Sequence, residues 1–123
     1  MSVPILQLGD TLIATLQLAL SDRDLAGLRE ALAERIGAVR ARGVIIDVTA
    51  LDVLDSFATR TILTIAHTSK LRGAETVVVG IQPDVAFAMV QLGLTLADVA
   101  TALDLEEGLE LLRQSTRKGP PTR

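Results

Sequence analysis

The feature that most constrains the fold of this chain is a short apolar run at residues 44–48, set between two segments with helical periodicity. The run is continuous in valine and isoleucine apart from Asp47, which is typical of a strand buried in a parallel sheet. Its length favours a strand over a helix. Apolar side chains recur at helical spacing before it, at Leu25, Leu28, Leu32, Ile36 and Val39, and after it, at Ile62, Leu63, Ala66 and Leu71. A buried strand between amphipathic helices predicts an α/β layer with a partly parallel sheet.

Two apolar segments, residues 3–8 and 11–17, precede the first helical pattern and are predicted as strands. Gly9 and Asp10 between them suit a two-residue turn, because glycine tolerates the positive φ that such turns require. The helix that follows should begin at Ser21, which has the spacing of a capping box with Asp24.

The second half of the chain continues the alternation. We expect a helix over residues 56–71, closed by Gly73, because glycine favours the end of a helix. Further elements are predicted as a strand at 76–79, a helix from Pro83 to about 92 and a short strand at 99–102. A final helix should run from Asp104 to about 114, because Asp104 and Glu107 have the spacing of a capping box.

The predicted order is β-β-α-β-α-β-α-(β)-α, a mixed sheet of four to five strands with four helices. Residues 1–115 should form one domain, since 123 residues suffice for one two-layer core. Residues 116–123 carry Arg117, Lys118, Gly119 and two prolines, which predicts a disordered basic tail.

Composition excludes several classes of function. The chain has no cysteine and one histidine, and its two aromatic residues are both phenylalanine. With a net charge of −3 and no basic stripe, a nucleic-acid groove is not expected. No apolar run approaches about 18 residues and the first residues lack a signal-type pattern, so we expect a soluble cytoplasmic protein without a membrane span. An apolar content of 49 % with so few aromatics favours burial of some surface in an assembly, and we expect a homo-oligomer.

The segment 51–57 turns from the buried strand into the second helix, at the edge of the sheet where α/β proteins bind their ligands. It places Ser56 at the start of that helix. The hydroxyl of Ser56 is either an N-cap that accepts a backbone N–H bond or a phosphoacceptor at the positive end of the helix dipole.

A catalytic serine is excluded by its surroundings. Ser56 lacks the flanking glycines of a nucleophile elbow. The single histidine, His67, lies eleven residues further along the same helix, which is roughly 16 Å at 1.5 Å per residue. We expect His67 to be a helix-surface or half-buried residue.

No metal or cofactor site is expected. Asp47, Asp52 and Asp55 lack the spacing of a calcium loop, and no glycine-rich phosphate loop accompanies them. Asp47 is interpreted as a polar strand residue, and the other two as turn formers or partner contacts. Gly27 and Gly37 inside the first helix are interpreted as points of close packing.

Five segments carry a family resemblance: residues 43–52, 55–57, 69–74, 80–83 and 101–106. Together they resemble the STAS domain, the domain of sulfate transporters and anti-sigma-factor antagonists. The resemblance is closer to the small S subunit of the bacterial stressosome, in register over about residues 3–115.

This resemblance implies a non-catalytic binding module. The S subunit assembles with larger STAS paralogues that carry sensory N-terminal domains, and no such domain is expected in this chain. The assembly sequesters an anti-sigma-type serine/threonine kinase, phosphorylation releases the kinase, and a separate phosphatase resets the scaffold. The phosphorylated serine falls on Ser56, with Thr59 as the second candidate. The implied partner-binding residues are Asp52, Asp55, Phe57, Thr59, Arg60 and Gln82.

Phe57 and Ala58 stand where free anti-sigma-factor antagonists usually have a small residue and a glycine. This difference favours the stressosome subunit. A free antagonist that switches partners outside a large assembly is the alternative, and a structural scaffold that is never phosphorylated is the third hypothesis.

Overall fold

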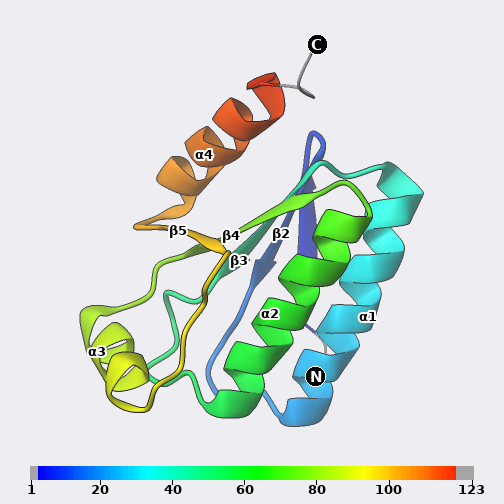
Figure 1. The fold of residues 1–123 in the computed structure, drawn as a ribbon. Helices are drawn as coiled ribbons and strands as arrows, with labels where there is room; N and C mark the ends of the chain where they lie inside the picture. Colours follow the sequence, from blue (N-terminus) through cyan, green and yellow to red (C-terminus); the bar gives the residue numbers. More distant parts are fainter. Residues whose placement is uncertain (1–2, 119–123) are drawn as a thin grey trace.

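A single five-stranded sheet organises the molecule, of which the computed structural model describes residues 3–118 (Figure 1). The strands lie in the order β1-β2-β3-β4-β5, with β1 antiparallel to β2 and all other neighbours parallel. This arrangement confirms the predicted α/β class and element order, including the short fifth strand. The strands are β1 (Ile5–Leu8), β2 (Thr11–Thr15), β3 (Gly43–Asp47), β4 (Glu75–Val79) and β5 (Ala100–Ala102).

The β1–β2 hairpin closes as its sequence predicts. Leu8 pairs with Thr11 across the two-residue turn, and Gly9 has a φ of 62°. A positive φ at the first turn position is typical of a type II′ turn, which explains the glycine there.

Helices cover both faces of the sheet (Figure 1). The helices α1 (Asp22–Val39) and α2 (Ser56–Leu71) lie side by side on one face, and α4 (Leu105–Lys118) lies on the other. The short helix α3 (Pro83–Gln91) begins at Pro83, as predicted, and lies beyond the carboxyl ends of the strands.

The larger part of the core lies between the sheet and the α1–α2 layer. It combines alternate strand residues with the buried sides of the two helices: Leu12, Val44, Ile46, Val78, Leu28, Leu32, Ile36, Ile62 and Ile65. A smaller cluster joins the opposite face to α4 and contains Ile13, Ile45, Val77, Val79 and Leu112. Gly108 allows this close approach, because a Cβ there would lie 2.6 Å from a methyl group of Val79.

Two sequence predictions about the helices differ from the structure. Leu71 was expected on the buried side of α2 but is 90 % exposed. At 100° per residue it lies about 200° beyond the buried Ser69, so it points away from the sheet. Helix α4 runs to Lys118, so the backbone of residues 116–118 is helical and not a disordered tail. The remaining tail residues, 119–123, lie outside the described part of the chain.

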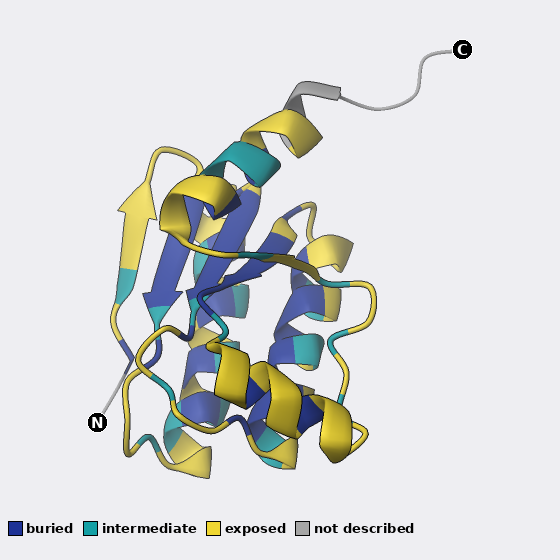
Figure 2. Cartoon of the chain, turned by 90° about the vertical axis from the view of Figure 1, so that its left-hand side faces the viewer, coloured by how far each residue is buried: buried dark blue, intermediate teal, exposed yellow. Residues whose placement is uncertain are grey.

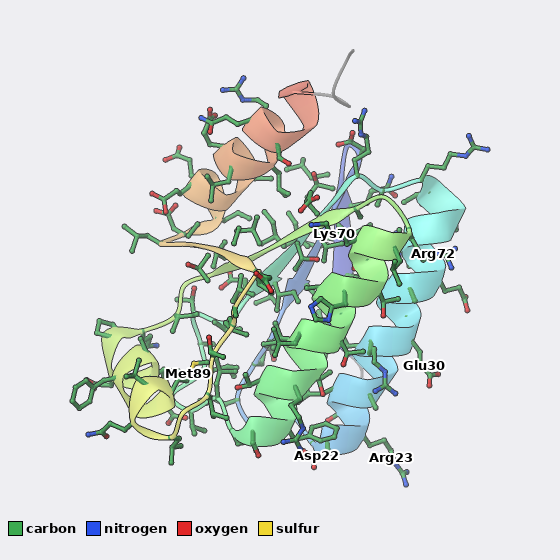
Figure 3. All side chains as sticks on the ribbon, viewed as in Figure 1. Asp22, Arg23, Glu30, Lys70, Arg72 and Met89 are labelled. Atoms are coloured by element: carbon green, nitrogen blue, oxygen red, sulfur yellow. The ribbon has the colours of Figure 1, made fainter. Side chains whose placement is uncertain are left out.

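The two glycines inside α1 differ from each other. A Cβ at Gly37 would overlap the Arg72 guanidinium, which agrees with the predicted close packing. Among residues 3–118, a Cβ at Gly27 would meet no atom within 4 Å outside its own stretch of helix, so the packing interpretation is wrong there. Figure 3 places Arg72 and Lys70 at the end of the helix layer opposite to Asp22 and Arg23.

Candidate functional site

Three loops meet at the carboxyl edge of the parallel strands. They comprise residues 16–21 after β2, residues 48–55 after β3 and residues 80–82 after β4. The first turns of α1 and α2 lie side by side at this edge (Figure 1). Helix N-termini present free N–H groups and the positive end of the helix dipole, which favours negative charge here.

The N-cap of α2 is Asp55 and not Ser56, so the cap interpretation of Ser56 is wrong. The Asp55 Oδ1 atom accepts the backbone N–H of Ala58 at 2.8 Å. The carboxylate reaches this donor from one residue earlier and is also favoured by the helix dipole. Ser56 is therefore the first helical residue, is exposed, and its hydroxyl makes no hydrogen bond within residues 3–118.

The N-terminus of α1 is capped as its sequence predicts. Ser21 Oγ accepts the Asp24 N–H at 3.1 Å, and Asp24 Oδ2 accepts the Ser21 N–H at 2.9 Å. The backbone N–H of Ser21 is the main reason why the pKa of Asp24 lies below its ordinary value of 3.8.

A residue that the sequence analysis missed, Thr49, ties two of the loops together. Its N–H and its hydroxyl both donate to Asp47 Oδ1, at 2.9 and 2.6 Å. Its carbonyl oxygen accepts Gln82 Nε2 at 2.5 Å, across 33 positions of sequence. Gly80 lies against Thr49 with a φ of 83°, and a Cβ there would lie 1.9 Å from the Thr49 hydroxyl. A glycine directly after β4 was the available signal for this contact.

The implied partner-binding residues divide by exposure. Asp52, Asp55, Arg60 and Gln82 are exposed at or beside the edge. Arg60 lies one helical turn after Ser56 on the outer side of α2, which continues through Thr64 and His67. His67 is exposed, in agreement with its prediction.

The other two residues of that set lie deeper. Phe57 is half-buried against the main core. Thr59 is only 2 % exposed, and its hydroxyl has no hydrogen-bond partner within residues 3–118. Because this hydroxyl faces the protein interior, we do not retain Thr59 as a phosphoacceptor or a partner contact.

A cleft of about 150 Å³ lies at the start of α2, where Asp55 and Ala58 line it. Its apolar floor comes from Leu16, Leu25 and Ala58, and its rim carries Asp22, Asp52 and Asp55. Exposed Leu18 and Val53 lie in the two loops that border the cleft. The sequence analysis missed the contribution of residues 16–20, although leucine recurs there at every second position after the strand ends.

Two features are absent from the described part of the chain, a cluster of metal-ligating side chains and a membrane-spanning helix. Within residues 3–118, no group of three or more histidine, aspartate or glutamate side chains could hold a metal ion. Over the same range, no helix has both the length and the apolar character that a bilayer crossing requires.

Solved structures similar to this chain include stressosome proteins. A serine-to-glutamate variant of RsbS from Moorella thermoacetica is 36 % identical and superposes with a TM-score of 0.81, covering 94 % of this chain and 97 % of that one. A structure described as the molecular architecture of the stressosome, a signal integration and transduction hub, is 37 % identical with a TM-score of 0.79, covering 93 % and 99 %. The anti-sigma-factor antagonist SpoIIAA is 15 % identical with a TM-score of 0.69, covering 90 % and 97 %, and shares the fold.

The RsbT co-antagonist protein RsbRA of Bacillus subtilis is 31 % identical over 77 residues, which is 63 % of this chain and 28 % of RsbRA. The chain therefore spans under a third of the length of this curated relative. The STAS domain family model matches residues 2–107. The chain belongs to the STAS domain family and is similar to the RsbS subunit of the stressosome over nearly its whole length.

Proposed function

We propose that this chain is the small scaffold subunit of a stressosome-type assembly, in which Ser56 is phosphorylated to release a serine/threonine kinase. The observation that carries the proposal is the free hydroxyl at the first position of α2. Because Asp55 caps the helix, Ser56 is exposed and is not needed to satisfy a backbone donor. The hydroxyl can therefore be modified without unfolding the helix start.

The kinase would dock on the surface around Ser56. This surface combines an apolar cleft, the exposed Leu18 and Val53, and the charged side chains of Asp52 and Arg60. An apolar centre with a charged rim is the usual composition of a protein–protein interface. The Thr49–Gln82 hydrogen bond holds two of the loops in one arrangement, which lowers the entropy cost of docking.

A phosphate on Ser56 would change the charge of this surface by about −1.5 to −2 at neutral pH. The helix dipole offsets part of that charge, by roughly 0.3–1 kcal/mol at an exposed site. Asp52 and Asp55 oppose it, since one like-charge pair about 6 Å apart at an effective dielectric of about 20 costs about 2.8 kcal/mol before screening. The phosphate should therefore act on partner affinity, and the helix itself should stay folded.

The partners would be an anti-sigma-type kinase, larger STAS paralogues with sensory N-terminal domains, and a phosphatase that removes the phosphate. Support for the paralogues comes from the similarity to the RsbT co-antagonists RsbRA and RsbRD. The chain would act by binding and not by catalysis, and a second copy would be among its partners.

The test is co-expression with the STAS paralogues and the kinase of the source organism, followed by sizing and kinase titration. We expect particles far larger than a dimer, and kinase binding that Ser56→Asp weakens by about 5- to 150-fold, the range of a coupling of about 1–3 kcal/mol. Thr64→Asp, also on the exposed side of α2, is the matched control and should bind like the unmodified chain. Kinase binding by monomers or dimers alone would instead support the free antagonist. Equal binding by the Ser56→Asp and Thr64→Asp variants would contradict the switch.

A further inference from the structure

The outer edge of β1 ends the sheet with unpaired backbone groups. Within residues 3–118, β1 pairs only with β2, on one side, in the register Leu8↔Thr11 and Leu6↔Ile13. In a two-residue hairpin the pair beside the turn is hydrogen-bonded, and bonded pairs then alternate along the strand. The N–H and C=O groups of Ile5 and Gln7 therefore point outward, away from β2.

The side chains at this edge are apolar and exposed. Leu6 is 65 % exposed and Leu8 is 55 % exposed. Both lie on the face of the sheet that carries α4, because they stand opposite Ile13 and Thr11. Helix α4 packs chiefly on β3, β4 and β5, so it leaves these leucines uncovered. Figure 2 shows β1 as an exposed strand beside the buried strands of the sheet.

The residues of this edge strand lack the blocking features that natural sheets often use. Edge strands are commonly blocked by a charged side chain, a proline or a bulge. The sequence of β1 is Ile-Leu-Gln-Leu and contains none of these. Pro4 precedes the strand, but by the same alternation its position faces β2 and not the open edge. The outer edge can therefore accept another strand without a steric or electrostatic penalty from β1 itself.

We propose that two copies of this chain associate by antiparallel pairing of their β1 strands about a two-fold axis. In this arrangement Ile5 stands opposite Gln7 of the second copy, and Leu6 stands opposite Leu6 of the second copy. The sheet then continues from one copy into the other. The surface is separate from the edge that carries Ser56 and does not depend on phosphorylation.

The outer edge of β1 is self-complementary, so we take a second copy of this chain as its occupant. The edge presents two outward residues, Ile5 and Gln7, with one residue between them. A second copy in the antiparallel direction presents the same two in reverse order, so every outward N–H meets a C=O and every outward C=O meets an N–H. Leu6 then forms a pair that is not hydrogen-bonded, in which the Cα atoms approach to about 4.5 Å and the leucine side chains pack closely.

The contact is small. A stable interface commonly buries about 800 Å² on each partner, more than a four-residue strand with two leucines supplies. The dimer should therefore be concentration-dependent when the chain is alone, and the contact should gain strength within a larger assembly through effective concentration.

The absence of cysteine in this chain makes a covalent test of the register possible. Leu6→Cys should give a disulfide-linked dimer under mild oxidation, because the two Cα atoms of that pair lie within disulfide range. Leu8→Cys should not, because the two copies of residue 8 would lie about 14 Å apart, at about 3.4 Å per residue. Leu71→Cys, which is even more exposed, is the control for random collision. Equal linkage in all three variants, or faster linkage through Leu8→Cys, would overturn the proposal.

A second pair of variants tests the hydrogen-bonded pairing itself, in the Leu6→Cys background. Gln7→Pro removes an outward N–H and leaves the β1–β2 bonds in place, whereas Gln7→Ala keeps the N–H. Cross-linking should be lost with proline and kept with alanine, with circular dichroism to confirm that both variants fold. Cross-linking that survives Gln7→Pro would exclude strand pairing. Adding Ser56→Ala to the Leu6→Cys variant should leave the cross-linking unchanged. A failure of the strand-pairing proposal can therefore be distinguished from a failure of the phosphorylation proposal.

Discussion

The first turns of α1 and α2 use the same two residue types in opposite order. Helix α1 begins with Ser21 as its cap and Asp22 as its first helical residue, whereas α2 begins with Asp55 as its cap and Ser56 in the first position. In both helices the side chain at the cap accepts the backbone N–H three residues later, at 3.1 Å in α1 and 2.8 Å in α2. The order of serine and aspartate therefore decides whether the serine hydroxyl caps the helix, as in α1, or stays without a capping bond, as in α2.

The consequence is functional as well as structural. At α1 the serine oxygen and the carboxylate of Asp24 are both used in the capping box. At α2 a carboxylate does the capping, and the neighbouring hydroxyl faces solvent. A modifying enzyme can reach that hydroxyl without breaking a helix cap.

Exchanging Asp55 and Ser56 at the start of α2 should remove the exposed, uncapped hydroxyl that distinguishes α2 from α1. The double variant Asp55→Ser, Ser56→Asp gives α2 the order found in α1. Its stability should stay within about 0.5 kcal/mol of the unmodified chain, because serine and aspartate are comparable caps. Phosphate uptake from the kinase should be lost, as measured by intact mass, while thermal unfolding verifies the fold. Phosphorylation of the exchanged chain at the original rate would show that the position of the hydroxyl is irrelevant.

The loop before α2 is held by a long-range contact with the loop after β4, so Gly80 in that second loop should respond differently to substitution from Gly27 in α1. Gly80→Ala places a Cβ against the Thr49 hydroxyl at a φ of 83°, and should cost about 2–4 kcal/mol from backbone strain and overpacking. Among residues 3–118, Gly27→Ala meets no atom within 4 Å outside its own stretch of helix and should stabilise the chain by about 0.5–1 kcal/mol. Denaturant unfolding of the two variants measures both values. Equal effects would contradict the role of Thr49 in holding the edge.

The smallest expected effect lies at the capping box of α1. The hydrogen bond from the Ser21 N–H lowers the pKa of Asp24 in the folded state. The ionised carboxylate therefore stabilises the fold at pH values above 3.8, the ordinary pKa of the group. This contribution should be lost as the pH falls through the lowered pKa of the folded state. The difference in melting temperature between the unmodified chain and Asp24→Asn should therefore be present at pH 7 and shrink below pH 3.8. A difference that is constant from pH 7 to pH 2 would contradict the linkage.

Local patterns were sufficient to predict most of the fold. The bounds of α2, the hairpin turn at Gly9 and the proline start of α3 all depend on neighbouring residues, and all are confirmed. The cap of α2 was predicted wrongly, because Asp55 and Ser56 are both good caps and their spacing alone does not select one. Thr49 and the cleft at the start of α2 depend on contacts between loops far apart in the sequence, which no local periodicity contains.

The central claim is that the free hydroxyl of Ser56 is the phosphoacceptor, and phosphosite mapping tests it most directly. The chain is incubated with ATP and the anti-sigma-type kinase of the source organism, and its intact mass and fragments are measured, with Ser56→Ala and Thr64→Ala as matched variants. We predict one added phosphate, about 80 Da, on the unmodified chain and on Thr64→Ala, and none on Ser56→Ala. Stoichiometric phosphate on Ser56→Ala would contradict the claim.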